Sequence, residues 1–417
     1  MTQSTAWDRD TFVHLTGYRE VEEVFRRSRD FVISGTKAGS DEFVHGTLVA
    51  LDGREHMGRR RALMKMISSD QPWGAEGTLI DDIFARYLAE VVAAVEPRDG
   101  HVRFDLIPVG RRIIWRLTAA FVGLDNIDDP AQVERFMGLV EPVLEGLTLE
   151  YQPEERHEAI LVAARKNRAL IREEMFDPSL ARRQVLVEKV RRGEAKAEDL
   201  PGDLITSMLS QSDEPDLELI FREMIALLAA AVNNPVSQMA WALDDATPWL
   251  DEHPEYRAKV TDKEFLGRMV KETMRLHRSS RPHVVRIAVK DTVLESSGRE
   301  VPQGTWVSLW LQAANRDTTI FGDDADEFDP FRQPLDPSVQ PFGIGLGSGA
   351  HVCLGRPLLL WDQGDEDAQG LLVKLLRFLL TAGVRPDPDG EQHEGGPEGG
   401  RRHDRYDVVM PVAARNP

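Results

Sequence analysis

The sequence predicts a mainly α-helical fold with a minor β region, built as a single domain over residues 1–417. Several long segments repeat apolar residues every three or four positions, as one face of a helix does. The segment 284–311 alternates instead and carries β-branched residues, which is typical of strands. No linker divides the chain, although roughly 150 residues per domain would allow two or three domains at this length.

The helical pattern is clearest from residue 79 to residue 95, where nine apolar residues follow one another at helical intervals. The same pattern predicts helices over 153–175, 217–243 and 262–277. Helices therefore account for most of the predicted secondary structure.

The β region begins within 284–311, where 305–310 reads as a strand. A glycine-rich stretch of low hydrophobicity, 389–400, precedes the strand-like residues 407–410. We interpret this stretch as a loop inside the domain, before a terminal hairpin, and not as a domain boundary.

Acidic residues outnumber basic ones. The chain has 70 Asp and Glu against 51 Lys and Arg, so its formal net charge is −19 and its pI is near 5.1. Such a protein repels polyanions, and we expect no nucleic-acid partner. The first residues lack the charged and apolar regions of a signal or anchor, and apolar runs such as 225–232 fall short of the ~20 residues of a membrane span. We expect a cytoplasmic protein without a membrane partner.

Cys353 is the single cysteine of the chain. One thiol excludes an internal disulfide and the zinc and iron–sulfur sites that need several thiolates. A lone thiol can serve as nucleophile, as axial metal ligand or as a small buried hydrophobe. Gly347, Gly349 and Gly355 remove side chains around it, as a backbone must when it passes close to a bulky group. The run 343–349 matches no phosphate-binding motif, because it fails G-x-G-x-x-G and no Lys follows it.

The residues around Cys353 resemble the haem loop of the cytochrome P-450 superfamily, F-x-x-G-x-(H/R)-x-C-x-G. Gly349, His351, Cys353 and Gly355 are in register, and Leu346 stands at the position of the Phe. The resemblance implies the cytochrome P-450 fold, a triangular prism with haem between two long helices. It also implies haem b, iron protoporphyrin IX, with Cys353 as the axial ligand of the iron.

Two further motifs extend the resemblance over most of the chain. Glu272 and Arg275 match the family's E-x-x-R, which alone would be an ordinary helical surface pair. Arg332 resembles the third member of the family's structural Glu-Arg-Arg cluster, and the run 314–317 matches soluble bacterial members. The resemblance therefore implies a structural cluster of Glu272, Arg275 and Arg332.

The two propionates of a haem are anions that need partners when partly buried. His56 and Arg60 resemble the family's E-H-x-x-x-R and would lie one helical turn apart on one face. Arg286 and His351 resemble further contacts to the propionates. Arg281 competes with Arg286 for this assignment, because the segment before Arg286 is about one residue longer than usual.

The family's oxygen-activating helix carries A-G-x-(D/E)-T, with an acid and a Thr that deliver protons. Here Asn233 stands at the acid position, Asn234 at the Thr position, and Pro235 follows. An amide does not titrate near neutral pH, and a proline kinks a helix by removing a donor. Two interpretations stay open: ordered water delivers the protons, or oxygen activation is diverted toward peroxide or an unusual oxidation.

The resemblance implies a monooxygenase that hydroxylates, epoxidises or similarly oxidises a small organic substrate, often in secondary metabolism, with O2 and electrons from ferredoxin and its reductase. Asn233 and Asn234 motivate an alternative, a peroxide-driven or non-redox isomerase- or dehydratase-like haem-thiolate enzyme. A non-catalytic haem or ligand-binding protein is a third possibility.

Substrate and partner contacts follow from the same resemblance. Candidate pocket residues are Leu228, Ala231, Arg281 and His283. If Arg281 and His283 reach the pocket, the substrate should carry a carboxylate or another acceptor, because an unpaired buried cation is costly. An acidic ferredoxin would be attracted by a basic face formed by Arg59, Arg61, Lys65 and Arg356.

Overall fold

The computed structural model describes residues 12–33, 40–68, 79–278, 283–360, 369–395 and 402–412. Contacts between Cα atoms divide the chain into two compact units. The first unit comprises Met1–Thr11, Ile33–Gln71 and Ile114–Val232, and the second comprises Phe12–Val32, Pro72–Ile113 and Asn233–Pro417. The expectation of a single domain stays a prediction.

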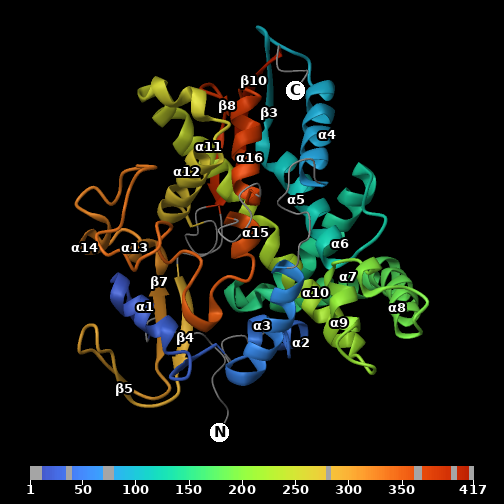
Figure 1. Ribbon diagram of the computed structural model, residues 1–417. Helices are drawn as coiled ribbons and strands as arrows, with labels where there is room; N and C mark the ends of the chain where they lie inside the picture. Colours follow the sequence, from blue (N-terminus) through green and yellow to red (C-terminus); the bar gives the residue numbers. More distant parts are fainter. Residues whose placement is uncertain are drawn as a thin grey trace. The chain divides into compact units, whose positions relative to one another are not determined.

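Helices build the first unit (Figure 1). They are α2 (Asp41–Val44), α3 (Gly53–Ser68), the end of α5 (Leu106–Val122), α6 (Pro130–Leu147), α7 (His157–Ile171), α8 (Asp177–Arg191), α9 (Leu204–Leu209) and α10 (Leu217–Ala231). Asp129 caps α6 by accepting from the Gln132 N–H, and Pro130 suits its first turn. Gly146 lets α6 and α7 approach closely, because a Cβ there would lie 2.8 Å from the Ala164 Cβ.

The second unit combines helices with all the strands of the described residues. Its helices are α1 (Tyr18–Arg26), α4 (Leu79–Ala94), the start of α5, α11 (Asn233–Glu252), α12 (Lys263–Leu276), α13 (Leu311–Ala314), α14 (Thr318–Phe321), α15 (Arg356–Leu360) and α16 (Leu371–Thr381). Within it α11, α12 and α16 pack side by side (Figure 1). The helices predicted from residues 79 and 262 correspond to α4 and α12, and the one predicted from residue 153 to α7.

One sheet has the strand order β1-β7-β4-β2. Its strands are β1 (Val13–Leu15), β2 (Phe31–Val32), β4 (His283–Ala288) and β7 (Trp306–Trp310). β1 is parallel to β7, and the other pairs are antiparallel. Leu15, Phe31, Val307 and Leu309 are fully buried in the core beneath α1. The strand expected at 305–310 is β7.

A second sheet has the order β3-β10-β8, and β9 pairs with β10. Its strands are β3 (His101–Asp105), β8 (Arg385–Pro386), β9 (Gln392–Gly395) and β10 (Arg402–Pro411). β9 and β10 run antiparallel and form a terminal hairpin. The expectation that 389–400 is a loop is wrong at residues 392–395, because these pair with β10 as its hairpin partner. A further small hairpin joins β5 (Thr292–Val293) to β6 (Glu300–Val301).

The helix predicted over 217–243 is interrupted at Val232, where α10 ends and α11 begins. Pro235 has no N–H to donate to the Ala231 carbonyl one turn earlier, which accounts for the break. Taken together, Leu217–Glu252 is long and apolar enough to qualify as a membrane span, contrary to the short run expected from the sequence. Its most apolar window is 56% buried in the protein, and a core helix passes the same test of length and composition.

The Glu23 carboxylate fastens α1 to the turn between β5 and β6. It accepts hydrogen bonds from the N–H groups of Glu295 and Ser296, each 2.9 Å away, and from Arg27 Nη1 at 2.7 Å. Burial raises the pKa of Glu23, but these donors outweigh burial and lower the pKa from 4.5 to about 2.

A lowered carboxylate pKa stabilises the folded state above the unfolded-state pKa, and this stabilisation is lost as the pH falls through the folded-state pKa. Glu23→Gln should lower the free energy of unfolding at pH 7 by ~2 kcal/mol and flatten its pH dependence between pH 4.5 and about 2. Urea unfolding across this range measures both effects. Glu90→Gln, which breaks an exposed pair with Arg86, is the control. If the free energy of unfolding of Glu23→Gln fell with decreasing pH as it does in wild type, the assignment of this pH dependence to Glu23 would be contradicted.

Candidate functional site

Cys353 lies in a loop between the Gly349–His351 turn and α15. Its N–H donates to the Leu346 carbonyl at 2.8 Å, which closes the loop. The Cys353 carbonyl in turn accepts from the Arg356 N–H at 3.3 Å, where α15 begins. The thiol is half-buried, so the backbone presents it at a surface and does not use it as core filler.

Gly349 allows this loop to pack against α1. Its φ of 65° is in the left-handed region, and a Cβ there would lie 2.5 Å from the Phe25 carbonyl oxygen. Any other residue would therefore strain the backbone and collide with α1. The glycine expected to admit a bulky group beside Cys353 is thus also required by the contact of the loop with α1.

The residues around Cys353 fit the haem that the sequence resemblance implies. Every residue from 350 to 359 is half-exposed, whereas apolar side chains elsewhere in the second unit form a buried core. The half-exposed side chains include Val352, Leu354, Leu358 and Leu359. An apolar surface around one thiol suits a flat macrocycle whose iron is bound by sulfur. Among the described residues, no group of three or more His, Cys, Asp or Glu could hold a metal ion instead.

Arg286 lies close to the cysteine loop through a shared neighbour. Its side chain on β4 is buried, donates to the Val285 carbonyl at 2.8 Å and lies 5.3 Å from the centre of the Phe25 ring. Phe25 therefore contacts the position of Gly349 with its carbonyl and Arg286 with its ring. The structure brings Arg286, His351 and Cys353 into one region of the second unit.

The other expected pocket and propionate residues of the second unit are placed as follows. His283, at the start of β4, is half-buried and packs 5.0 Å from the Trp310 ring. Arg281 lies outside the described residues, so its competition with Arg286 stays open. Asn233 and Asn234 are half-buried in the first turn of α11.

The first unit contains the remaining candidates. His56 is buried, and Arg60, one turn further along α3, is half-buried. Ala231 at the end of α10 is half-buried, whereas Leu228 is fully buried. Ala231 therefore offers surface to a ligand, and the Leu228 side chain does not.

Arg59 has a role that the sequence did not predict. Its guanidinium donates to Glu223 of α10 at 2.9 Å, and the fully buried Glu223 side chain also accepts from the Leu48 N–H at 3.1 Å. Burial raises the pKa of Glu223, against the opposing effect of Arg59. The ion pair joins α3 to α10 and orients the helix that carries His56 and Arg60. The sequence did contain a signal for this ion pair: Glu223 lies on the apolar face of 217–231, and a charge buried there needs a partner.

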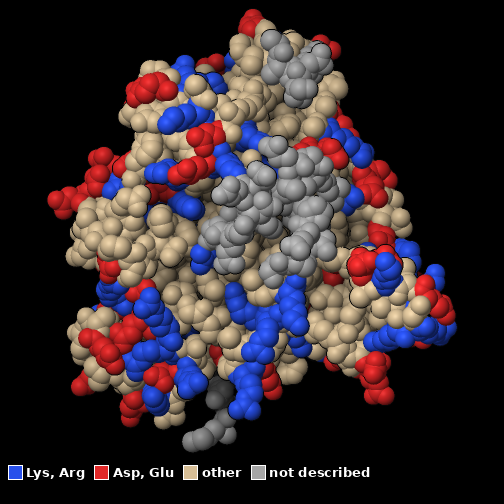
Figure 2. Space-filling model, viewed as in Figure 1, with Lys and Arg blue, Asp and Glu red and all other residues tan. Residues whose placement is uncertain are grey.

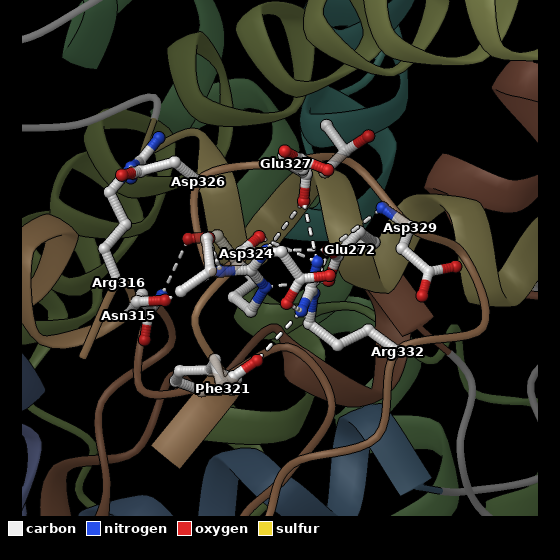
Figure 3. A network of polar contacts seen from close by, with 12 residues as sticks. Glu272, Asn315, Arg316, Phe321, Asp324, Asp326, Glu327, Asp329 and Arg332 are labelled. Carbon is white, nitrogen blue, oxygen red and sulfur yellow. Dashed lines mark hydrogen bonds and ion pairs between the residues drawn. The ribbon is translucent and has the colours of Figure 1, made fainter. Parts of the chain in front are cut away.

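The three members of the expected structural cluster form one buried network (Figure 3). Arg275 donates to both Glu272 oxygens at 2.8 and 2.7 Å, and Arg332 Nε donates to Glu272 Oε1 at 3.0 Å. Arg275 also donates to the carbonyls of Asn315 and Ala325, at 2.8 and 2.6 Å. The network thus joins α12 to the segment 315–332.

Asn315 extends this network to the cysteine loop. Its Nδ2 donates to the Arg275 carbonyl at 3.0 Å, and its Oδ1 accepts from the Ile344 N–H at 2.7 Å. Gly343 lets the backbone pass here, because a Cβ would lie 2.2 Å from Asn315 Oδ1. The start of the loop that carries Cys353 is therefore fixed to the buried ion pair. In the sequence, Asn315 was indicated only by the resemblance of residues 314–317 to a segment of soluble bacterial cytochromes P-450.

Part of the chain is similar to known proteins. The Cytochrome P450 family model matches residues 259–359, which include α12 and the cysteine loop. The erythromycin C-12 hydroxylase of Saccharopolyspora erythraea is 32% identical over 195 residues, 44% of this chain and 45% of that protein. Cytochrome P450 71A19 of Arabidopsis thaliana is 31% identical over 196 residues, 41% of this chain and 38% of the relative. The matched segments thus span less than half of these relatives.

The fold matches solved structures over nearly the whole chain. The crystal structure of CYP109E1 from Bacillus megaterium, in complex with testosterone, has a TM-score of 0.68 and 17% sequence identity. The match covers 98% of this chain and 95% of that structure. Mainly helical architecture with small sheets, as predicted, is therefore confirmed.

Removing one partner of the buried network tests its contribution. Arg275→Met leaves the Glu272 carboxylate, 3% exposed, with less charge compensation and should lower the free energy of unfolding by about 3–5 kcal/mol. Arg275→Lys should rescue little, because a lysine lacks the planar fork. Arg268→Met breaks an exposed pair with Glu264 on the same helix and should cost less than about 1 kcal/mol. Equal losses of stability in urea for Arg275→Met and Arg268→Met would contradict this role.

Proposed function

We propose that this chain belongs to the cytochrome P450 superfamily and is a haem-thiolate monooxygenase that oxidises a small organic substrate. The observation that carries the proposal is the half-buried Cys353 in an apolar, half-exposed loop anchored to α1 and to the Glu272 network. The oxidation would be a hydroxylation, an epoxidation or a related reaction, with O2 and electrons from a ferredoxin and its reductase. The protein would act in the cytoplasm.

Cys353 would bind the iron of haem b through its thiolate. Arg286 and His351 in the second unit, and His56 and Arg60 on α3, would hold the propionates, because cations and imidazole N–H groups pair with partly buried carboxylates. Thiolate-bound haem supplies the electron donation that favours O–O cleavage and the insertion of oxygen into a substrate. Apolar side chains around Cys353 would exclude water from the sulfur.

The residues at the start of α11 set the proton supply. Asn233 and Asn234 carry no titratable proton, so each can hold a water in place but cannot act as an acid. This favours a second candidate, a peroxide-driven or non-redox haem-thiolate enzyme, because hydrogen peroxide brings its own protons. A non-catalytic haem protein is a third candidate, and retention of the single thiolate argues against it.

Substrate contacts would come from Ala231 and His283, which are half-buried. A half-buried imidazole supplies one polar group beside an apolar wall, which suits a mostly apolar substrate with one hydrogen-bonding group. One of the relatives is named as a hydroxylase of an organic molecule, erythromycin.

The spectrum of the reduced, carbon monoxide-bound protein tests the thiolate bond. Wild type should show the absorption band of thiolate-bound iron, and Cys353→Ser should lose it, because a hydroxyl is not an equivalent ligand. Product formation should then be compared with reductant, ferredoxin and O2, and with hydrogen peroxide alone. Turnover in the first assay supports the monooxygenase, and turnover in the second alone supports the peroxide-driven enzyme. Bound haem without either turnover would favour the non-catalytic protein.

The ferredoxin would dock on the basic face of α3, where Lys and Arg side chains gather (Figure 2). Arg61 and Lys65 are exposed, one turn apart, and no ion pair of either is found among the described residues. Arg59 is excluded from this surface, because it pairs with Glu223. Arg356 in the second unit lies 5.2 Å from the Phe342 ring and is half-buried.

Neutralising this face should weaken the partner complex. The double variant Arg61→Gln, Lys65→Gln should raise the ferredoxin KM by roughly fivefold at low salt, since two exposed charges each contribute up to ~1 kcal/mol. The difference should shrink at high salt because surface charges are screened. Lys166→Gln, an exposed lysine on α7, is the control. A KM unchanged at every salt concentration would remove this surface from consideration.

A further inference from the structure

One face of α11 carries polar and aromatic side chains from its first turn to its middle. Asn234, Gln238, Trp241 and Asp245 follow one another at intervals of four, three and four residues, so they lie on one stripe of the helix. Gln238 and Trp241 are buried. A buried polar stripe on a core helix is costly unless it is fully hydrogen-bonded, and it therefore requires an explanation.

His277, just after α12, completes this stripe. Its ring stacks on the Trp241 ring with centroids 4.1 Å apart and planes 4° from parallel. Its Nε2 lies 3.0 Å from Asp245 Oδ1, and Thr273 Oγ1 donates to Asp245 Oδ2 at 2.7 Å. Because Nε2 faces a carboxylate oxygen, Nε2 bears a proton, and Nδ1 is the ring nitrogen left for a further contact.

Two buried polar atoms of Gln238 and His277 have no hydrogen-bond partner among the described residues. Gln238 Nε2 donates to the carbonyl of His277 at 2.5 Å, which brings the Gln238 amide next to residue 277. The two atoms are Gln238 Oε1 and His277 Nδ1. A shared water would satisfy both atoms, since buried waters occupy such polar sites.

We propose that a water held by Gln238 Oε1 and His277 Nδ1, together with the Asp245–His277 pair, is the proton source for the first turn of α11. This inference rests on the proposed function and replaces the acid that Asn233 does not supply. His277 gives a proton from Nδ1 to this water while the water gives one of its own to a second water, held by the Asn234 amide. The ring keeps its Nε2 proton on Asp245 and takes up a new Nδ1 proton from bulk water after each transfer, so no charge accumulates. Asp245 is a positioning residue in this route, because it acts through His277.

Other titratable groups of the second unit lie near the Asp245–His277 pair. Asp244, next to Asp245, accepts from the Tyr406 hydroxyl of β10 at 3.0 Å, and burial raises the pKa of Asp244. His403 of β10 lies 4.3 Å from the Trp241 ring, and Glu394 of β9 also acts on Asp244. The carboxyl groups beside His277 are thus Asp245, which pairs with the ring, and Asp244.

Product formation with O2 and with hydrogen peroxide should be compared, because a loss of proton supply affects only the O2-dependent reaction, whereas a loss of structure affects both. Asp245→Asn should lower product formation with reductant, ferredoxin and O2 by roughly 10²-fold, the lower range for acid–base contributions. It should leave peroxide-driven product formation unchanged, because hydrogen peroxide carries its own protons. The pH profile of the O2-dependent reaction should change in the same variant, and Asp245→Glu should restore part of the activity.

His253→Gln is a matched control. His253 stacks on Trp249 of α11, with ring centroids 4.2 Å apart and planes 15° from parallel, and its Nδ1 bonds the Trp249 carbonyl. Within the part of the chain that the structure describes, no carboxylate pairs with His253. This variant should keep both activities and the pH profile of wild type.

The water itself gives a readout without turnover. A crystal structure should show it within hydrogen-bonding distance of Gln238 Oε1 and His277 Nδ1, and Gln238→Leu should remove it. A dry site, or equal loss of both activities in Asp245→Asn, would overturn the inference while leaving the monooxygenase assignment intact. Failure of the proposed function can be told apart from failure of this inference, because wild type itself would then form no O2-dependent product.

Discussion

The buried carboxylate of Glu272 is the charge on which the second unit depends. It is 3% exposed and is compensated by two arginines, one from its own helix and one from a loop 60 residues later. A buried charge persists only when its lone pairs are occupied, so the pairing fixes α12 and the segment 315–332 at once. Asn315 then transmits this position to Ile344 and to the cysteine loop. The position of the thiol therefore depends on an ion pair that never touches it.

The same principle recurs in the first unit with a different pair. Glu223 of α10 is fully buried, and Arg59 together with the Leu48 N–H satisfies it. In each unit a helix carries one acid inward, and an arginine from another segment compensates its charge. α3, which bears the expected haem contacts His56 and Arg60, is thus held by electrostatics as well as by apolar packing. Surface arginines such as Arg61 remain available for other roles.

α11 joins two features of the protein. Its first turn has amides where an acid and a hydroxyl are usual, and its middle carries Asp245 beside His277. α11 therefore does carry a titratable group, Asp245, but this group lies about three helical turns beyond Asn233 and Asn234. The family match over 259–359 covers His277 and the cysteine loop and does not cover α11.

The sequence by itself determined the elements whose causes are local. Periodicity located α4, α7 and α12, and the glycines around Cys353 indicated a backbone that passes close to other groups. Local pattern could not identify the partners of buried charges, because Glu223 and Arg59 are 164 residues apart along the chain. Nor could it place Gln238, His277 and Asp245 together, since their contacts arise only when α11 packs against α12. Sequence periodicity reports which faces are apolar, whereas the satisfaction of buried polar groups is decided by packing between distant segments.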